Sequence, residues 1–535
     1  MSKFNHGRAR PTGTSFVRST TSEHEPVRTH EGGAGYTRDT RSELWLLAIT
    51  NMTGERTFYE SANVRAARFR DLVRALALED PAWLVGMIGY LRSTANIRTA
   101  AVVAAAEMAH ARTQAAAHGH TRQAVAAALQ RADEPAELLA YWFGRYGRRL
   151  PIALKRGLAD GVHRLYTERA ALKYDNPTSP IRMGDVVELV QPRTHHPHIR
   201  GTWREDLYRH LIERRHSRGN PLPETLRTLH ARQALTAVPV QARHELLTGP
   251  AGTDAVRDAA MTWESTAAWL QRPMDAAAWE AVIPTMGLMA AARNLRNFDQ
   301  AQASDRVADQ IIRRLTDPDQ VQRSRMFPFR FLAAYRAAPS LRWGHALEQA
   351  LNHSLANVPR LPGRTLVLVD RSISMFGAIS DRSGLNRADT AALFGTALAL
   401  RADRADLIEF GSGHAPVTVP PGASLLRVVD GLFHRMGGTN TASAVNDNYQ
   451  GHDRVVLLTD EQAAPHAYTD PLARIPDRVP VYTWNLAGYS AGHAPSGTGN
   501  RHVFGGLTDD AFRLIPLLEA GRDAAWPWEQ ESAAA

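Results

Sequence analysis

The chain has 535 residues, which is too long for a single hydrophobic core and predicts about two to four domains. It has no cysteine, so disulfides and thiolate metal sites are excluded and a reducing compartment is favoured. No apolar stretch approaches the roughly 18 residues that a membrane-spanning helix needs, and the first residues lack the apolar core of a signal peptide. We therefore expect a soluble cytoplasmic protein without a membrane partner.

Charge is unevenly distributed along the chain. Residues 361–535 contain 14 Lys and Arg and 19 Asp and Glu, which gives a net charge of −5. Of the 63 basic and 54 acidic residues in total, 49 and 35 therefore lie in residues 1–360, and that part has a net charge of +14. Such a basic surface predicts a polyanionic partner, and nucleic acid is the commonest one.

The basic part divides into a short arm and a long helical region. Residues 1–35 are rich in Arg, Ser, Thr, Gly and His and offer little to bury, so we expect a disordered basic arm. Residues 36–358 have apolar side chains at helical spacing, most clearly over 81–91, 99–111, 123–130, 137–143 and 279–295. Ala-rich helices joined by short loops over about 300 residues predict an all-α array of stacked helix pairs rather than one bundle.

A second domain is expected over residues 359–535. The Pro-Arg-Leu-Pro-Gly run at 359–363 ends the helical pattern. The apolar run 364–369 follows and is typical of a buried parallel strand covered by helices. Asp370, Ser372 and Ser374 come next at alternating positions, at the strand end where an open α/β sheet has its ligand crevice.

Two further oxygen-bearing residues belong with this triplet. Thr439 lies in a Gly-Gly-Thr loop, and Asp460 ends a second apolar strand over 454–459. Neutral hydroxyls with only two carboxylates form a weakly charged oxygen cage, which suits Mg²⁺ because this ion prefers octahedral oxygen geometry and keeps exchangeable waters. The sequence therefore predicts a divalent cation site.

This set of residues resembles the metal-ion-dependent adhesion site of von Willebrand factor A domains. The expected positions are filled by Asp370, Ser372, Ser374, Thr439 and Asp460. The resemblance implies a doubly wound α/β domain over 359–535 that binds Mg²⁺ and accepts an acidic residue of a protein ligand. Arg371 departs from the usual neutral residue and is expected to place a positive charge near the ion.

The helical part also resembles a known module. The fragments are Arg131–Glu134, Leu150–Arg156, Ala171–Tyr174, Met289–Leu295 and Phe327–Phe329. Their order, followed by an A-type domain, is similar to the TROVE module of the Ro ribonucleoprotein autoantigen family and its bacterial relatives, over roughly residues 40–530. The resemblance implies a HEAT-like helical-repeat ring over 36–358. Such a ring binds single-stranded ends of structured or misfolded noncoding RNA in its hole and a Y-like RNA outside, and an RNA-processing exonuclease is a further partner.

The candidate RNA contacts are basic, aromatic and amide residues near the helix ends. They supply phosphate neutralisation, stacking and hydrogen bonds. They are Arg145, Arg148, Arg149, Lys155, Arg156, Lys173, Tyr174, Arg193, His195, Arg293 and Asn294. For each of them, a solvated helix face is the alternative. Met183 stands where the family commonly has an RNA-binding histidine, and Arg182 is expected to substitute in part.

Two patterns that suggest other chemistry carry less weight. Gly488-Tyr489-Ser490-Ala491-Gly492 matches the GxSxG of a hydrolase, but a loop sequence follows it where a nucleophile elbow requires a helix. His195, His196 and His198 allow a transition-metal site, yet no carboxylate accompanies them at helical spacing, so we expect them to be exposed or to face RNA.

The sequence therefore favours a non-enzymatic RNA-binding scaffold or chaperone that carries Mg²⁺. The alternative is a cytoplasmic metal-dependent protein-interaction module that does not bind RNA. An RNA-processing enzyme is the weakest interpretation, because the chain shows no paired general acid and base in a nucleic-acid context.

Overall fold

The computed structural model describes residues 12–20, 27–50, 56–194, 203–356, 358–378, 385–420, 422–431, 433–465, 470–497 and 499–529. The chain forms two compact units. The α/β unit combines Met1–Leu76, Met326–Arg336 and Leu347–Ala535, and the helical unit combines Ala77–Arg325 and Ala337–Ala346. The predicted borders at 35/36 and 358/359 differ from this division, because residues on both sides of the helical unit fold with the sheet.

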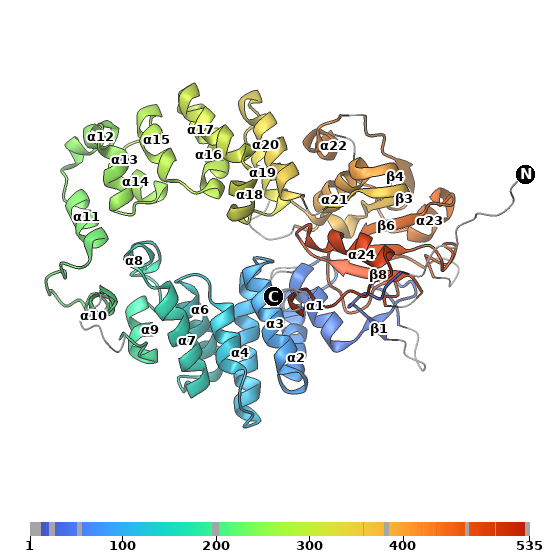
Figure 1. The fold of residues 1–535 in the computed structure, drawn as a ribbon, viewed down its shortest axis with the longest axis horizontal. Coiled ribbons are helices and arrows are strands. Elements are labelled where there is room, and N and C mark those ends of the chain that lie inside the picture. The colour runs from blue at the N-terminus through green and yellow to red at the C-terminus, as the bar shows by residue number, and fades with distance from the viewer. Residues whose placement is uncertain are drawn as a thin grey trace, which may run out of the picture. The chain divides into compact units, whose positions relative to one another are not determined.

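The helical unit is a succession of short helices, many of which pack against a helix one or two places along the chain (Figure 1). Contacts between alternate helices, such as α3 with α5 and α5 with α7, give the repeat character that the sequence predicts. The helices are α3 Pro81–Ser93, α4 Arg98–Gln114, α5 Thr121–Ala128, α6 Glu134–Tyr146, α7 Ile152–Leu165, α8 Glu168–Tyr174, α9 Met183–Val190, α10 Trp203–Arg215, α11 Arg227–Thr236, α12 Val240–Thr248, α13 Gly252–Asp258, α14 Trp263–Leu270, α15 Ala276–Val282, α16 Leu288–Gln300, α17 Asp305–Thr316 and α18 Pro318–Ser324.

Glycines on α7 allow α5 and α7 to pack closely. A Cβ added at Gly157 would lie 2.6 Å from the Cβ of Val125, and one added at Gly161 would lie 2.5 Å from a methyl carbon of Leu129. Because residues four apart share one face of a helix, both glycines form a single groove for the apolar face of α5.

The single helix expected over 279–295 is wrong. The structure has α15 to Val282, a short 3₁₀ helix η1 (Ile283–Thr285) and then α16 from Leu288. Pro284 has no backbone N–H and its ring clashes with the preceding turn, so an α-helix cannot run through it unbroken. The apolar pattern continues across the break because both helices face the same core.

The α/β unit contains a six-stranded sheet in the order β5-β4-β3-β6-β7-β8. Its strands are β3 Leu361–Asp370, β4 Ala402–Phe410, β5 His414–Pro416, β6 Arg454–Thr459, β7 Val481–Asn485 and β8 Arg501–Gly505. All neighbouring pairs are parallel except β4 and β5. Every residue of β6, β7 and β8 is buried, as a sheet covered on both faces requires, and the predicted doubly wound architecture is confirmed.

Helices complete this unit around the sheet. They are α1 Thr40–Thr50, α2 Ala62–Glu79, α19 Pro328–Ala337, α21 Arg387–Arg401, α22 Leu425–Gly431, α23 Thr441–Asn448 and α24 Leu514–Glu519. Helix α20 Leu341–Ser354 belongs to the helical unit up to Ala346 and to this unit from Leu347, and the last residues of α2 and α19 also belong to the helical unit. Helix α21 lies directly on β3, and a Cβ added at Gly395 would lie only 2.4 Å from Val369. Within the part of the chain that the structure describes, no helix is long and apolar enough to cross a membrane.

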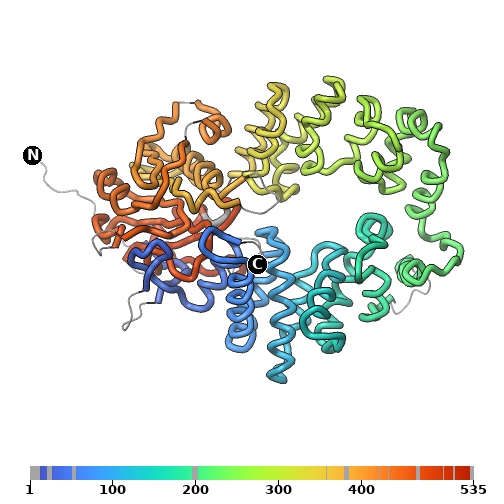
Figure 2. Tube along the Cα trace, turned by 180° about the vertical axis from the view of Figure 1, so that it is seen from behind, coloured from blue at the N-terminus to red at the C-terminus, as the bar shows by residue number. Residues whose placement is uncertain are grey.

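The prediction of a disordered arm over 1–35 is wrong for the described residues 12–20 and 27–35. Strand β1 (Ser19–Thr20) pairs with β2 (Thr37–Arg38), and Tyr36 forms a β-bridge with Gly492. Val17 is fully buried, and the ring of Phe16 lies 4.6 Å from that of Trp526. Figure 2 shows this N-terminal chain, in blue, alongside the strands of the sheet. The small and polar residues of this segment suggested disorder. They are buried by distant parts of the chain, which the local sequence does not reveal.

His502 on β8 makes this packing sensitive to acid. Its ring is 2 % exposed, lies 5.3 Å from the ring of Tyr482, and places Nε2 2.8 Å from the Thr12 hydroxyl. Burial, aided by the charge of Arg501, lowers the pKa of His502 to about 4. In the unfolded chain, His502 therefore takes up a proton as the pH falls through its ordinary pKa of 6.5. In the folded chain it stays neutral until about pH 4.

We expect His502 to lower the free energy of unfolding by up to about 3 kcal/mol as the pH falls from 6.5 to 4. In His502→Gln this contribution should be absent, so the difference in unfolding free energy between wild type and variant should change over this range. Chemical denaturation of both proteins at a series of pH values measures it. Parallel stability curves would show that His502 does not titrate in this way.

Candidate functional site

The predicted metal-site residues come together at the carboxyl ends of β3 and β6. Asp370 is the last residue of β3, and Asp460 directly follows β6, its neighbour in the sheet. Ser372 caps the short 3₁₀ helix η2 (Ile373–Phe376), which contains Ser374. Thr439 lies in the loop before α23. Strand ends and loops thus bring five residues from three segments to one edge of the sheet.

Backbone hydrogen bonds hold these three segments together. The amide of Ile373 donates to the carbonyl of Gly437 at 2.6 Å, which joins the triplet to the Gly-rich loop. The amide of Ala464 donates to the carbonyl of Thr439 at 2.9 Å, which joins that loop to the segment after Asp460. The site is therefore a rigid part of the α/β unit.

The Asp370 carboxylate is fixed by two donors. Its Oδ1 accepts the Ser372 amide at 2.8 Å, and its Oδ2 accepts the Thr459 hydroxyl at 2.6 Å. The hydroxyls of Ser372 and Ser374 lie 3.2 Å apart. A pair of hydroxyl oxygens at this separation beside a carboxylate matches one edge of the coordination shell of a hard cation.

Asp460 supplies the second carboxylate, and one of its oxygens is unsatisfied. Oδ1 accepts the Gln462 amide at 3.2 Å, whereas Oδ2 is buried without a hydrogen-bond partner among the described residues. Burial, together with the negative charge of Asp370, raises the pKa of Asp460 to about 7. Burial also raises the pKa of Asp370. Two desolvated carboxylates that repel each other form an environment that a cation would stabilise.

The donor set fits a hard cation and excludes a soft one. In the described ranges, no three His, Asp or Glu side chains gather as a possible metal site, so hydroxyl oxygens are needed to complete the shell. Oxygen donors alone favour Mg²⁺ over transition metals that prefer imidazole or thiolate. Residues Asp370, Ser372, Ser374, Thr439 and Asp460 are therefore suited to Mg²⁺.

Arg371 makes its hydrogen bonds to groups other than the five site residues, while its charge acts on Asp370. Its guanidinium donates to the carbonyls of Ala388 at 2.8 Å and His434 at 2.9 Å, and lies 4.9 Å from the ring centre of Phe376. Burial lowers the pKa of Arg371. It serves to fix the loops around the site.

Tyr59 and Tyr489 border the site and were missed by the sequence reasoning. The phenol of Tyr59 interacts with the Ser374 side chain, and the charge of Asp460 acts on both tyrosines. The two rings lie 5.6 Å apart. No motif marks Tyr59, because its position follows from the packing of the N-terminal chain. Tyr489 lies in the GxSxG pattern, where Gly492 enters a β-bridge rather than a helix.

The basic candidates fall into separate groups on the helical unit. The hairpin between α6 and α7 carries Arg145, Arg148, Arg149, Lys155 and Arg156. Arg148, Arg149 and Arg156 are exposed, whereas Arg145 lies 3.3 Å from the buried Glu107. We call these five residues the α6–α7 basic cluster.

A second group lies at the end of α8. The amine of Lys173 lies 5.1 Å from the ring centre of Tyr174, and the guanidinium of Arg131 lies 5.3 Å from the same ring. Arg131 was not among the predicted contacts. Arg193 and Arg293 are exposed on other parts of the unit.

Two predicted RNA contacts are wrong. Arg182 is buried and donates to the carboxylate of Asp175, whose side chain is fully buried. The charge of Arg182 therefore compensates Asp175 and does not face an RNA. Asn294 is 3 % exposed, and its amide donates to the carbonyl of Ala290 one turn earlier in α16. Met183, at the position of the family's histidine, is buried as well. His195, His196 and His198 lie outside the described residues.

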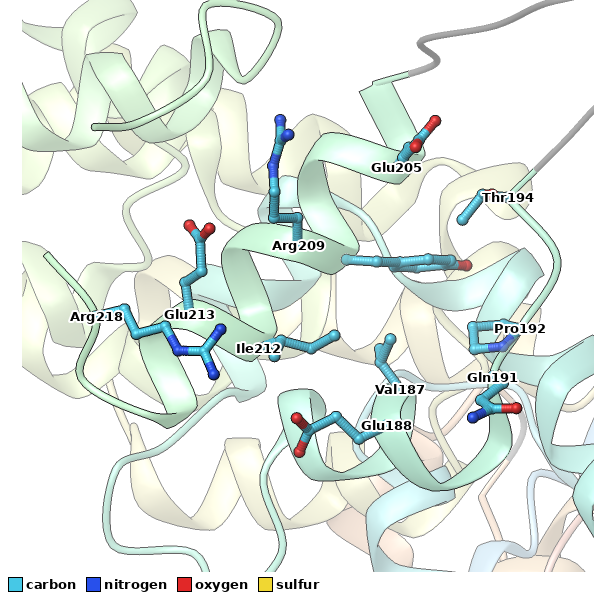
Figure 3. A pocket seen from close by; sticks show the side chains of 11 residues that line it. Val187, Glu188, Gln191, Pro192, Thr194, Glu205, Arg209, Ile212, Glu213 and Arg218 are labelled. Atoms are coloured by element: carbon cyan, nitrogen blue, oxygen red, sulfur yellow. The ribbon is translucent and has the colours of Figure 1, made fainter. Parts of the chain in front are cut away.

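A cavity of about 770 Å³ lies between α9 and α10 (Figure 3). Val187 and Ile212 face each other across it, whereas the head groups of Glu205 and Arg209 point away from them. Glu188, Glu205 and Glu213 outnumber Arg209 and Arg218 in the lining, so this cavity does not attract anions. Its residues differ from the predicted RNA contacts.

Comparison with known proteins agrees with this architecture. Residues 251–342, from the start of α13 to the first turn of α20, match the model of the TROVE domain. The crystal structure of the Deinococcus radiodurans RO (RSR) protein has a TM-score of 0.60 at 19 % sequence identity, over 90 % of this chain and 98 % of that chain. A search of curated proteins finds no match. The structural likeness extends through both the helical repeats and the α/β unit.

The burial of Arg182 predicts a structural role that a mutation can test. Arg182→Met removes the main partner of buried Asp175, which, among the described residues, keeps the Met183 amide at 3.0 Å and Arg214 at 3.5 Å. We expect the free energy of unfolding to fall by about 3 kcal/mol, because a buried charge is left undercompensated. Urea denaturation measures this change. The exposed Arg156→Met is the matched control, and an equal, small effect in both variants would contradict the structural role.

Proposed function

We propose that this chain, a Ro-like TROVE-domain protein, binds noncoding RNA through its helical unit and Mg²⁺ through its α/β unit. The TROVE match and the Ro fold support an RNA-binding protein of the Ro type. The net charge of +14 over residues 1–360, which contain the whole helical unit together with parts of the α/β unit, is the physical basis for a polyanionic ligand.

The observation that carries the proposal is the α6–α7 basic cluster. Helix α7 has 14 residues and begins after Pro151 without a side-chain cap, and the first amides of a helix have no partner within the helix itself. The positive end of its dipole lies among Arg148, Arg149, Lys155 and Arg156. A phosphate at this point finds backbone donors and guanidinium groups together, which is the usual composition of a phosphate site.

Tyr174 offers a place for a nucleobase. The Lys173 amine and the Arg131 guanidinium lie 5.1 and 5.3 Å from the centre of its ring, and Arg131 also pairs with Asp133 at 2.6 Å. A base that replaces one of these cations on the phenol ring would have its phosphates near positive charge. This arrangement favours unpaired nucleotides over a duplex, whose bases already stack on each other. We therefore expect the protein to bind the single-stranded end of a structured or misfolded RNA.

A ring of repeats that threads the RNA end, a Y-like RNA and an RNA-processing exonuclease are the further features that the Ro resemblance implies. No described residue is assigned to them. We propose a scaffold or chaperone without enzymatic activity, in which bound Mg²⁺ offsets the buried charge of Asp370 and Asp460.

Charge reversal tests the RNA site. Lys155→Glu with Arg156→Glu should weaken binding of an RNA with a free 3′ single-stranded end by at least about tenfold, because two phosphate contacts become repulsive. The slope of log affinity against log salt should decrease in magnitude by about 1.4. Fluorescence anisotropy at several salt concentrations gives both values. A blunt duplex of equal length should bind more weakly than the free-end RNA.

The matched control reverses two exposed arginines of the α/β unit, Arg427→Glu with Arg474→Glu, and changes the net charge by the same amount. It should retain the affinity of the wild type. Equal loss in both double variants would show that only net charge matters. Equal affinity for blunt duplex and free-end RNA would contradict recognition of single-stranded ends.

Removal of Asp370 tests the metal site. Asp370→Ala takes away one of two carboxylates and the acceptor of the Ser372 amide and Thr459 hydroxyl. We expect Mg²⁺ affinity to fall by more than about tenfold, because carboxylate charge supplies most of the attraction. Calorimetric titration of MgCl₂ into the full chain measures it, and RNA affinity serves as the internal control. Identical isotherms for two folded proteins would remove Mg²⁺ from the proposal.

A further inference from the structure

The cavity between α9 and α10 takes no part in the proposed function. The two helices pack tightly near the start of α9, where a Cβ added at Gly184 would lie 2.5 Å from the Leu211 carbonyl oxygen and 2.8 Å from the Cβ of Arg215. The cavity lies farther along α9, where Val187 and Gln191 line it. Its volume of about 770 Å³ is within the range of small-molecule sites.

Apolar groups form much of the wall of this cavity. Val187 and Ile212 face each other across it, one from each helix (Figure 3). Pro192 and Tyr208 also line it. Because these side chains are positioned by the packing of two helices, the cavity is formed before any ligand arrives. The apolar part of a ligand would be favoured here, since apolar surface would leave water on both partners.

Tyr208 adds a polar group that has no partner among the described residues. Its side chain is 3 % exposed, and its phenol oxygen is buried without a hydrogen bond. Burial raises the pKa of Tyr208 to about 12, so the phenol stays a neutral hydroxyl that can both donate and accept. An unpaired buried hydroxyl is unfavourable, and a ligand that forms a hydrogen bond with it removes this cost.

Negative charge exceeds positive charge in the lining. The charged residues there are Glu188, Glu205, Glu213, Arg209 and Arg218. The Arg209 guanidinium donates to Asp206, which lies outside the lining, so its charge is already compensated. Glu188 lies 2.9 Å from the ring nitrogen of His216, and Glu213 accepts from the neutral amide of Asn220 at 2.8 Å. The remaining excess of carboxylates favours a cation and disfavours phosphate groups.

We infer that this cavity binds a small organic monocation that carries an ammonium group on an apolar aryl or alkyl body. The body lies against Val187 and Ile212. The ammonium group donates to the phenol oxygen of Tyr208 and is attracted by the carboxylates of Glu188 and Glu213. Such a ligand is opposite in charge to RNA, so the inference goes beyond the proposed function and does not depend on it.

Matched probes with the same phenyl ring test the charge requirement. They are 2-phenylethylamine, 2-phenylethanol and phenylacetate, which are cationic, neutral and anionic at neutral pH. The full chain, freed of RNA by nuclease treatment, is titrated with each probe and followed by saturation-transfer difference NMR. The amine should bind at least about threefold more tightly than the alcohol, because the carboxylates attract only the cation. Phenylacetate should show no binding.

Two variants locate the probe in the cavity. Val187→Trp fills the space between the helices, so it should abolish binding of the amine. Tyr208→Phe removes the hydroxyl and keeps the ring, so it should weaken binding of the amine by about fivefold through the loss of one hydrogen bond. The melting temperature of each variant is measured beside that of the wild type. Tyr208→Phe changes the packing least and decides the question if Val187→Trp does not fold.

A charge variant tests the role of the carboxylates. Glu188→Gln with Glu213→Gln should remove most of the preference for the amine over the alcohol and leave binding of the alcohol unchanged. Glu224→Gln with Glu245→Gln is the matched control, because both residues are exposed on the same unit and lie outside the lining. This control should keep the preference of the wild type.

Several outcomes would overturn the inference. The wild type could fail to bind the amine, or bind phenylacetate equally well. Unchanged binding of the amine in folded Val187→Trp and Tyr208→Phe would place the probe elsewhere on the protein. Tighter binding of Nα-acetyl-lysine amide than of 2-phenylethylamine would show that the cavity receives a lysine side chain of a protein partner, and would exclude a small-molecule site.

Discussion

A buried ion pair between Arg38 and Glu461 fixes the N-terminal chain to the sheet, and the surroundings of the candidate metal site depend on it. The Arg38 guanidinium donates to Glu461 at 2.9 Å, and both side chains are almost fully buried. Asn485 donates to the same carboxylate from the end of β7. A buried charge without its partner is strongly unfavourable, so the N-terminal chain and the strand ends must form together.

This pair also explains the backbone next to the site. Glu461 directly follows Asp460 and has a φ of 61°, a conformation that costs energy for a residue with a side chain. The backbone turns there so that Asp460 faces the metal-site residues while Glu461 faces Arg38. Adjacent carboxylates thus serve different purposes: the charge of Glu461 is compensated by protein groups, whereas one oxygen of Asp460 has no partner among the described residues.

Local pattern was enough to predict the helical repeats and the parallel sheet, because each of these follows from residue types at fixed spacing. It also marked the five oxygen-bearing residues that gather at the ends of β3 and β6, whereas their binding of a metal stays a prediction. Long-range packing was not accessible. Arg38 and Glu461 are 423 positions apart, and nothing in either neighbourhood predicts their contact. The same limit applies to the basic residues. The sequence around Arg148 and Arg182 does not distinguish them. In the structure Arg148 is exposed, whereas Arg182 pairs with the buried carboxylate of Asp175.

The two units differ in the sign and the burial of the charge that they present to a ligand. In the helical unit, Arg148, Arg149 and Arg156 near the start of α7 are exposed, and none of them forms an ion pair with a described carboxylate, so an anion is favoured. In the α/β unit, carboxylates at the ends of β3 and β6 are buried beyond the reach of solvent, so a cation is favoured. An exposed cluster binds a large and variable ligand through many weak contacts. A buried cluster of carboxylate and hydroxyl oxygens is suited to a small hard cation, because only a small ion can be enclosed by these oxygens.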